Sequence, residues 1–78
     1  MKTMQRYFRV DRKNIAFLKF ILEAYDGIAV MRTLDPHEGV VEIMIAPDFE
    51  REVTEILDNL RGEFEVQPID PPTDIKEL

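Results

Sequence analysis

The sequence contains no cysteine, no tryptophan and no serine, and it has one histidine and three glycines among 78 residues. Without cysteine the chain forms no disulfide, no zinc–thiolate site and no iron–sulfur cluster. Without serine or cysteine, a single histidine cannot build a nucleophilic triad. The three glycines stand apart from one another, so no glycine-rich phosphate loop is present. These absences exclude several common classes of enzyme.

Basic residues are also few, since ten Lys and Arg stand against sixteen Asp and Glu, giving a net charge of −6. Modules that bind nucleic acid usually present a basic face, so this composition argues against that function. No apolar run is long enough to span a membrane, and no secretory signal pattern opens the chain. We therefore expect a cytoplasmic domain over residues 1–69 and a frayed tail over residues 70–78.

Hydrophobic periodicity and turn residues predict six elements along the chain. Strands are expected over residues 3–10, 28–34, 40–46 and 63–67, and helices over residues 12–25 and 49–61. Asp11 is the expected N-cap of the first helix, Asn14 is the alternative cap, and Gly27 ends that helix. A five-residue turn, Asp35–Gly39, joins the second and third strands into an antiparallel hairpin.

The order strand, helix, strand, strand, helix, strand predicts an α+β fold, the ferredoxin-like β-α-β-β-α-β sandwich. Right-handed crossovers place both helices on one face of a four-stranded antiparallel sheet with strand order 4-1-3-2. The residues expected to face the helices are Phe8, Val10, Ile28, Val30, Leu34, Val41, Ile43 and Ile45. The residues expected on the bare face are Gln5, Tyr7, Arg9, Ala29, Met31, Thr33, Val40, Glu42 and Met44.

The charge is distributed unevenly along the sequence. Residues 1–19 contain six bases and one acid, whereas residues 20–78 contain four bases and fifteen acids. Because the first and fourth strands are neighbours in the predicted sheet, we expect Arg6 or Arg9 to pair with Glu63 or Glu65. A patch that binds an anionic ligand is the alternative interpretation.

The first predicted helix carries more apolar residues than one sheet face can cover. A domain of this length gains only about 3–5 kcal/mol from its own core, which also favours association. We therefore expect a homodimer. The candidate interface residues are Phe17, Phe20 and Ala24 on the helix, or Tyr7, Met31 and Met44 on the bare face of the sheet.

Four residues at the start of the first helix form the candidate ligand site. The four are Asp11, Arg12, Lys13 and Asn14. Asp11 can hold an ammonium group, and Arg12 or Lys13 together with the helix N-terminus can hold a carboxylate, so the site would bind a zwitterion. The alternative is an ordinary capped helix start with solvated bases. His37 and its neighbouring acids would make a poor metal site, because one imidazole on a turn supplies too few fixed ligands. We expect no metal and no cofactor.

The chain resembles the ACT-domain family over residues 5–67. The resemblance depends on three segments: Val10-Asp11-Arg12-Lys13-Asn14-Ile15, Gly27-Ile28 and Gly39-Val40-Val41-Glu42-Ile43. It implies a regulatory module that pairs with a second copy and binds an amino acid at the loop after the first strand. ACT domains typically have glycine where Asn14 stands. The chain also resembles short stand-alone bacterial domains of unknown function.

These observations favour a small non-catalytic domain that self-associates and senses an amino acid or small anion. A structural or adaptor domain that binds another protein is the first alternative. A small enzyme of the dimeric-barrel type, with its cavity between two subunits, is the second. Tyr7 lies where RNA-recognition domains place a stacking aromatic, but the third strand has no aromatic and carries Glu42, so RNA binding is not expected.

Overall fold

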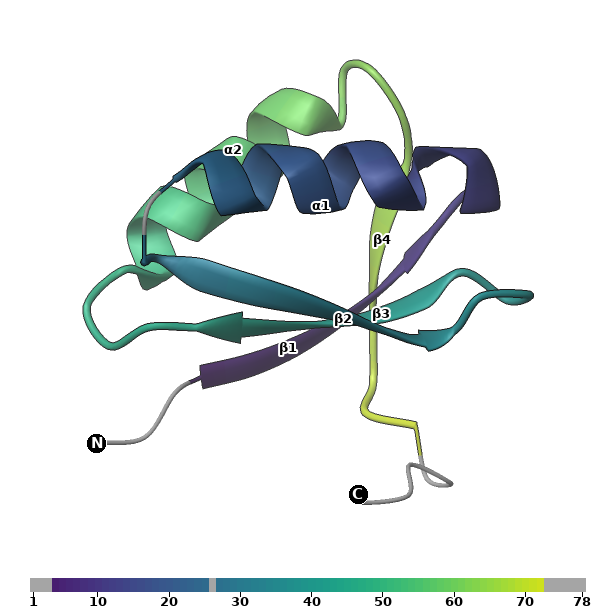
Figure 1. The fold of residues 1–78 in the computed structure, drawn as a ribbon, viewed down its shortest axis with the longest axis horizontal. Helices are drawn as coiled ribbons and strands as arrows, with labels where there is room; N and C mark the ends of the chain where they lie inside the picture. Colours follow the sequence, from purple (N-terminus) through teal and green to yellow (C-terminus); the bar gives the residue numbers. More distant parts are fainter. Residues whose placement is uncertain (1–3, 26, 73–78) are drawn as a thin grey trace.

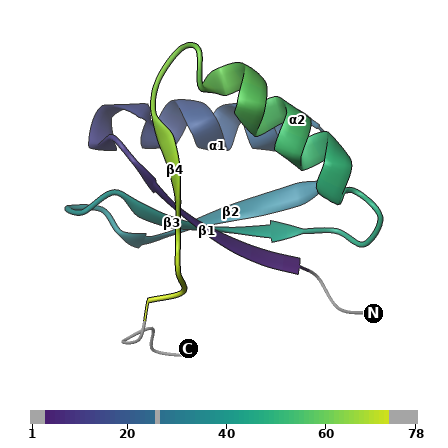
Figure 2. The same cartoon turned by 180° about the vertical axis from the view of Figure 1, so that it is seen from behind.

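The computed structural model describes residues 4–25 and 27–72 and has the predicted order of elements (Figure 1). The elements are β1 (Met4–Val10), the 3-10 turn η1 (Arg12–Asn14), α1 (Ile15–Ala24), β2 (Ala29–Asp35), β3 (Val40–Ile45), α2 (Glu50–Leu60) and β4 (Val66–Ile69). The strands form one antiparallel sheet in the order β2-β3-β1-β4, which is the predicted order read from the other edge. Both helices cover one face of the sheet, as Figures 1 and 2 show. The ferredoxin-like prediction is confirmed.

The core lies between the helices and the covered face of the sheet. Phe8 and Val10 of β1 are buried there, as predicted, together with Val41, Ile43 and Ile45 of β3. The helices contribute Leu18, Leu22, Val53, Leu57 and Leu60. On α2 these apolar positions form a single stripe, so the rest of that helix faces water.

The predicted orientation of the second strand is wrong. Ala29 and Met31 point into the core, whereas Val30 lies on the bare face with 55% of its surface exposed. The register explains this result, because Met31 lies opposite Ile43 and residues opposite each other in an antiparallel pair share a face. Both faces of this strand carry apolar side chains, so alternation alone did not identify the inner one.

The fourth strand begins three residues later than predicted, and this overturns the expected pairing of charges. Glu63 and Glu65 precede β4, and the ladder places Gln67 opposite Arg9. Arg6 forms its ion pair with Glu50 of α2 instead. Pro68 lies in an edge strand one residue before its end, a position that tolerates a missing N–H.

The chain enters α1 through the 3-10 turn, so the α-helical part begins at Ile15 rather than at residue 12. A side-chain oxygen of Asp11 accepts the backbone N–H of Lys13 at 3.2 Å, which confirms Asp11 as the cap of this turn. Asn14 occupies the N-cap position of α1 without a side-chain hydrogen bond. Helix α1 ends at Ala24, and Gly27 then adopts a positive φ of 75° that glycine tolerates best.

Gly39 fixes the β2–β3 turn against the end of β1. Its φ is 73°, and a Cβ at this position would overlap the backbone carbonyl of Val10. The carbonyl oxygen of Gly39 accepts the N–H of Val10 at 2.8 Å. The turn and the first loop are therefore joined at one point by a contact that only glycine allows.

No helix within residues 4–25 and 27–72 is both long and apolar enough to cross a membrane. Residues 70–72 of the predicted tail belong to no helix or strand, and residues 73–78 lie outside the described residues.

Candidate functional site

Three segments that are distant in the sequence meet at one end of the sheet and enclose a hollow of about 640 Å³, which we call the loop hollow. The segments are the turn between β1 and α1, the turn between β2 and β3, and the connection from α2 to β4. The lining residues are Arg9, Val10, Asp11, Arg12, Lys13, Asn14, His37, Glu38, Glu63, Phe64, Glu65 and Gln67. All four residues of the predicted ligand site belong to this set.

Hydrogen bonds from backbone N–H groups fix the turns that form two walls of the loop hollow. The carbonyl oxygen of Asp11 accepts the N–H of Asn14 at 2.8 Å and closes the first turn. In the second turn, Oδ1 of Asp35 accepts the N–H groups of His37 at 2.9 Å and Glu38 at 3.1 Å. The Asp35 carboxylate therefore shapes the turn. Within the described residues, no group of three or more His, Asp or Glu side chains lies close enough together to hold a metal ion.

Opposite charges face each other around the loop hollow. Three bases (Arg9, Arg12 and Lys13) and four acids (Asp11, Glu38, Glu63 and Glu65) line it, together with His37. Across residues 4–25 and 27–72, none of these seven charged side chains is within ion-pair distance of an opposite charge; the ion pairs there lie elsewhere. Separated charges of both signs around one cavity are suited to a small ligand that carries both a carboxylate and an ammonium group.

Sequence reasoning identified one wall of the loop hollow and missed the other two. Glu63 and Glu65 are predicted in a strand, and His37 and Glu38 are predicted in a turn and considered only as parts of a poor metal site. The predicted topology indicates the other two walls. In an antiparallel sheet with this strand order, β1 and β2 end at one end of the sheet, and β3 and β4 begin at that same end. The three connections must therefore lie close together.

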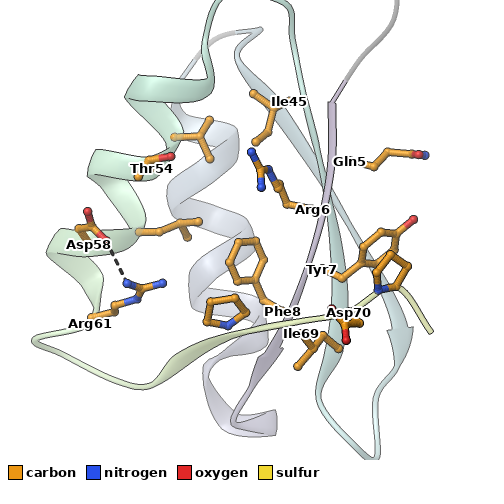
Figure 3. Close-up of a pocket in the computed structure, with 14 residues that line it drawn as sticks. Gln5, Arg6, Tyr7, Phe8, Ile45, Thr54, Asp58, Arg61, Ile69 and Asp70 are labelled. Atoms are coloured by element: carbon orange, nitrogen blue, oxygen red, sulfur yellow. Dashed lines mark hydrogen bonds and ion pairs between the residues drawn. The ribbon is translucent and has the colours of Figure 1, made fainter.

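A second cavity, of about 480 Å³, lies between α2, β1 and the end of β4 (Figure 3). Arg6 and Phe8 point from β1 toward α2, while Gln5 and Tyr7 point to the other side of the strand. Three of the four charged side chains here are paired: Arg61 lies 3.1 Å from Asp58, and Arg6 contacts Glu50. Asp70 forms no ion pair within residues 4–25 and 27–72. This cavity therefore offers few unpaired polar groups to select a ligand, so we consider the loop hollow the better candidate.

The bare face of the sheet carries a row of three polar side chains across three strands. Tyr7 and Arg32 lie directly opposite Glu42 in the ladder. The phenol of Tyr7 donates to Oε2 of Glu42 at 2.9 Å, and the Arg32 guanidinium lies 3.0 Å from Oε1 in an ion pair whose angles fall outside hydrogen-bond geometry. Glu42 is only 1% exposed. The hydrogen bond to this carboxylate raises the pKa of Tyr7 above its usual value of 10, and partial burial adds to the increase.

The predicted interface residues lie on two separate surfaces and, in one case, in the core. Phe17, Phe20 and Ala24 are exposed on α1, while Tyr7 and Met44 are half-buried on the bare face of the sheet. Met31 is 3% exposed in the core, so its expected place on the bare face is wrong. Val30 occupies that surface instead.

The family model for a domain of unknown function, DUF4911, matches residues 8–63 of the chain. No curated protein and no solved structure matches it. The matched range includes β1 from Phe8 onward, both helices, the hairpin and most of the residues that line the loop hollow. Because this match covers more than half of its residues, the chain belongs to the DUF4911 family.

Proposed function

We propose that this chain is a non-catalytic, self-associating regulatory domain, similar to ACT domains, that binds an amino acid or a small anion in the loop hollow. The observation that carries the proposal is the set of charges of both signs around this one cavity that have no ion-pair partner within residues 4–25 and 27–72. Arg12 and Lys13 would hold the carboxylate, and acids such as Asp11 and Glu63 would hold the ammonium group. The position after the first strand is the one that the ACT resemblance implies.

Ordinary solvated surface charges are the competing explanation, and the two make different predictions for ligand binding. A ligand that binds only the folded state raises the melting temperature by mass action. We therefore expect one or more of the twenty amino acids, or a small anion such as phosphate, to raise the melting temperature as its concentration increases. If none of them does so at tens of millimolar, the proposed function is wrong.

The two ligand classes can be separated with three related compounds. The amino acid that gives the largest shift is compared with the amine that lacks its carboxylate and the acid that lacks its amino group. A zwitterion site requires both groups, so the amine and the acid should each give a much smaller shift. If the acid alone matches the amino acid, the site is one for small anions.

Substitutions locate the ligand. Arg12→Gln and Lys13→Gln should each reduce the ligand-induced shift, because each removes a positive charge from the hollow. Arg51→Gln removes the same charge from α2, outside the hollow, and should leave the shift unchanged. Asp11→Ala also removes a cap, so the shift must be compared with that variant's own ligand-free melting temperature.

A further inference from the structure

Helix α1 and Tyr25, the residue that follows it, expose three aromatic side chains to water. The exposed fractions are 47% for Phe17, 71% for Phe20 and 48% for Tyr25, although the inner positions Leu18 and Leu22 are completely buried. Helix α2 differs, because its buried residues form one stripe and its outer positions are polar. The apolar surface of α1 therefore exceeds what this fold covers.

The outer surface of α1 alternates small and large side chains. Ala16, Phe20 and Ala24 are spaced four residues apart, so they lie along one side of the helix, and all three are exposed. Beside them a hollow of about 460 Å³ lies between the helices. It is lined by Phe20 and Ala24 of α1, by Tyr25 just after that helix, and by Ile56 and Leu60 of α2, among others. The exposed ring of Phe20 lies next to the space left by the small side chain of Ala24. Two copies of this surface are therefore complementary in shape, because the ring of one copy can fill the space beside the alanine of the other.

Two charged residues of α1, Lys19 and Glu23, are placed so that they complement a second copy of the helix only in the antiparallel orientation. Lys19 and Glu23 are both exposed, and neither forms an ion pair within the described part of the chain. They lie two residues before and two residues after Ile21. Two α1 helices can pack antiparallel with their two-fold axis at the level of Ile21 along the helix. Each Lys19 then lies opposite Glu23 of the second copy. A parallel pair would instead bring like charges together.

We propose that two copies of this chain pair through antiparallel α1 helices, with Phe20 packed beside Ala24 of the other copy and Lys19 facing its Glu23. The proposal specifies the surface for the self-association included in the proposed function, and it does not depend on the ligand. Taking about 200 Å² for each aromatic side chain, the three rings expose roughly 330 Å² per copy. The two copies together would bury about 660 Å² of ring surface, which is less than a stable dimer interface buries, so the pairing should be weak and the dimer should dissociate on dilution.

Charge reversal tests this pairing on the intact chain. In sedimentation velocity we expect the wild-type chain to shift from monomer to dimer as its concentration rises to the high micromolar range. Lys19→Glu and Glu23→Lys should each weaken the dimer by tenfold or more, because each places like charges opposite one another. An equal mixture of the two variants should dimerise again, and so should the double variant. Glu55→Lys, an equal charge change on the outer side of α2, is the control and should dimerise like wild type.

Cysteine cross-linking tests the direction of the pairing, because the chain contains no cysteine of its own. A mixture of Lys19→Cys and Glu23→Cys chains should cross-link mainly as the mixed pair. The proposal is overturned if the wild type stays monomeric at every concentration, if both single reversals dimerise like wild type, or if residue 19 cross-links mainly to itself. Phe20→Ser should abolish the dimer while leaving ligand-induced thermal shifts intact, so failure of the interface can be distinguished from failure of the ligand site.

Discussion

The two faces of the sheet are stabilised in different ways. The face under the helices buries aliphatic and aromatic side chains and places its charged residue, Arg6, at the rim, where the ion pair with Glu50 is about half exposed. The bare face has no helix over it, yet it contains the most buried charged side chain among the described residues, Glu42. Its neighbours Tyr7 and Arg32 are long enough to cover this carboxylate from both sides.

This difference shows that exposure of a sheet face does not mean exposure of each residue on it. Transferring a carboxylate from water is unfavourable unless other groups replace the lost hydration. On the covered face the ion pair lies in water and contributes little to stability. On the bare face the carboxylate depends on its two partners, so removing one of them should have a larger effect.

The largest loss of stability should come from removing a core side chain of β2, and its neighbour on the bare face is the matched comparison. Met31→Ala should destabilise the fold by about 2–5 kcal/mol, because it leaves a cavity in the core. Val30→Ala, one residue away on the bare face, should change the free energy of unfolding by less than about 0.5 kcal/mol. Urea unfolding measures both. Equal losses would contradict the orientation of β2.

The second prediction concerns the ion pair on the bare face. Arg32→Met should cost about 1–3 kcal/mol at pH 7, because it leaves a buried carboxylate with Tyr7 as its remaining partner. Glu42→Gln should cost less, because Arg32 is already 42% exposed and water can solvate it.

Replacing Arg32 and Glu42 together is the control for the larger loss expected in Arg32→Met. The double variant Arg32→Met/Glu42→Leu removes the buried charge together with its counter-charge, and it should regain most of the stability lost in Arg32→Met. Urea unfolding of the wild type, Arg32→Met, Glu42→Leu and the double variant completes the cycle. A double variant less stable than Arg32→Met would show that the carboxylate itself stabilises this face.

The third prediction uses the raised pKa of Tyr7. Because the folded state favours the protonated phenol, the hydrogen bond stabilises the fold below pH 10, and this stabilisation is lost as the pH rises through the raised pKa. Tyr7→Phe should therefore be less stable than wild type by about 1 kcal/mol at pH 7. The two chains should converge in alkaline solution.

Tyrosinate absorbance gives a direct measurement of this pKa. The chain has two tyrosines, so Tyr25→Phe leaves the signal of Tyr7 alone. In that variant we expect a midpoint above 10 that returns toward 10 when Glu42→Gln is added. A midpoint unaffected by Glu42→Gln would exclude the hydrogen bond as the cause.

The smallest effect should come from the ion pair at the rim of the covered face. Arg6→Met should change the free energy of unfolding by less than about 1 kcal/mol, because both side chains are about half exposed. Any difference from wild type should decrease in 0.5 M salt, since exposed pairs are screened. A loss as large as that of Arg32→Met would remove the contrast between the two faces.

The order of elements and most of the core could be predicted from the sequence, because the glycines and the turn residues separate clear periodic segments. The orientation of β2 could not, since Ile28, Val30 and Leu34 are as apolar as Ala29 and Met31. Only the register with β3, a long-range property, identifies the inner face. The start of β4 was misplaced because alternation continues through Glu63 and Glu65 without a break.

The candidate ligand site was predicted in part for a related reason. Asp11, Arg12, Lys13 and Asn14 are consecutive, so a local pattern reveals them. Glu38 and Glu63 join them only after the sheet has folded. The burial of Glu42 likewise depends on which residues of the neighbouring strands lie opposite it, and no pattern within one strand contains that information.

The close contact between Gly39 and Val10 bears on the entropy of ligand binding. Loops that must become ordered around a ligand lose conformational freedom, and that loss reduces affinity. Here the turn between β2 and β3 is already joined to the end of β1, just before the first turn, by a backbone hydrogen bond of 2.8 Å. A ligand of few atoms would then meet walls that are preorganised, so even a molecule as small as a single amino acid could be held with useful affinity.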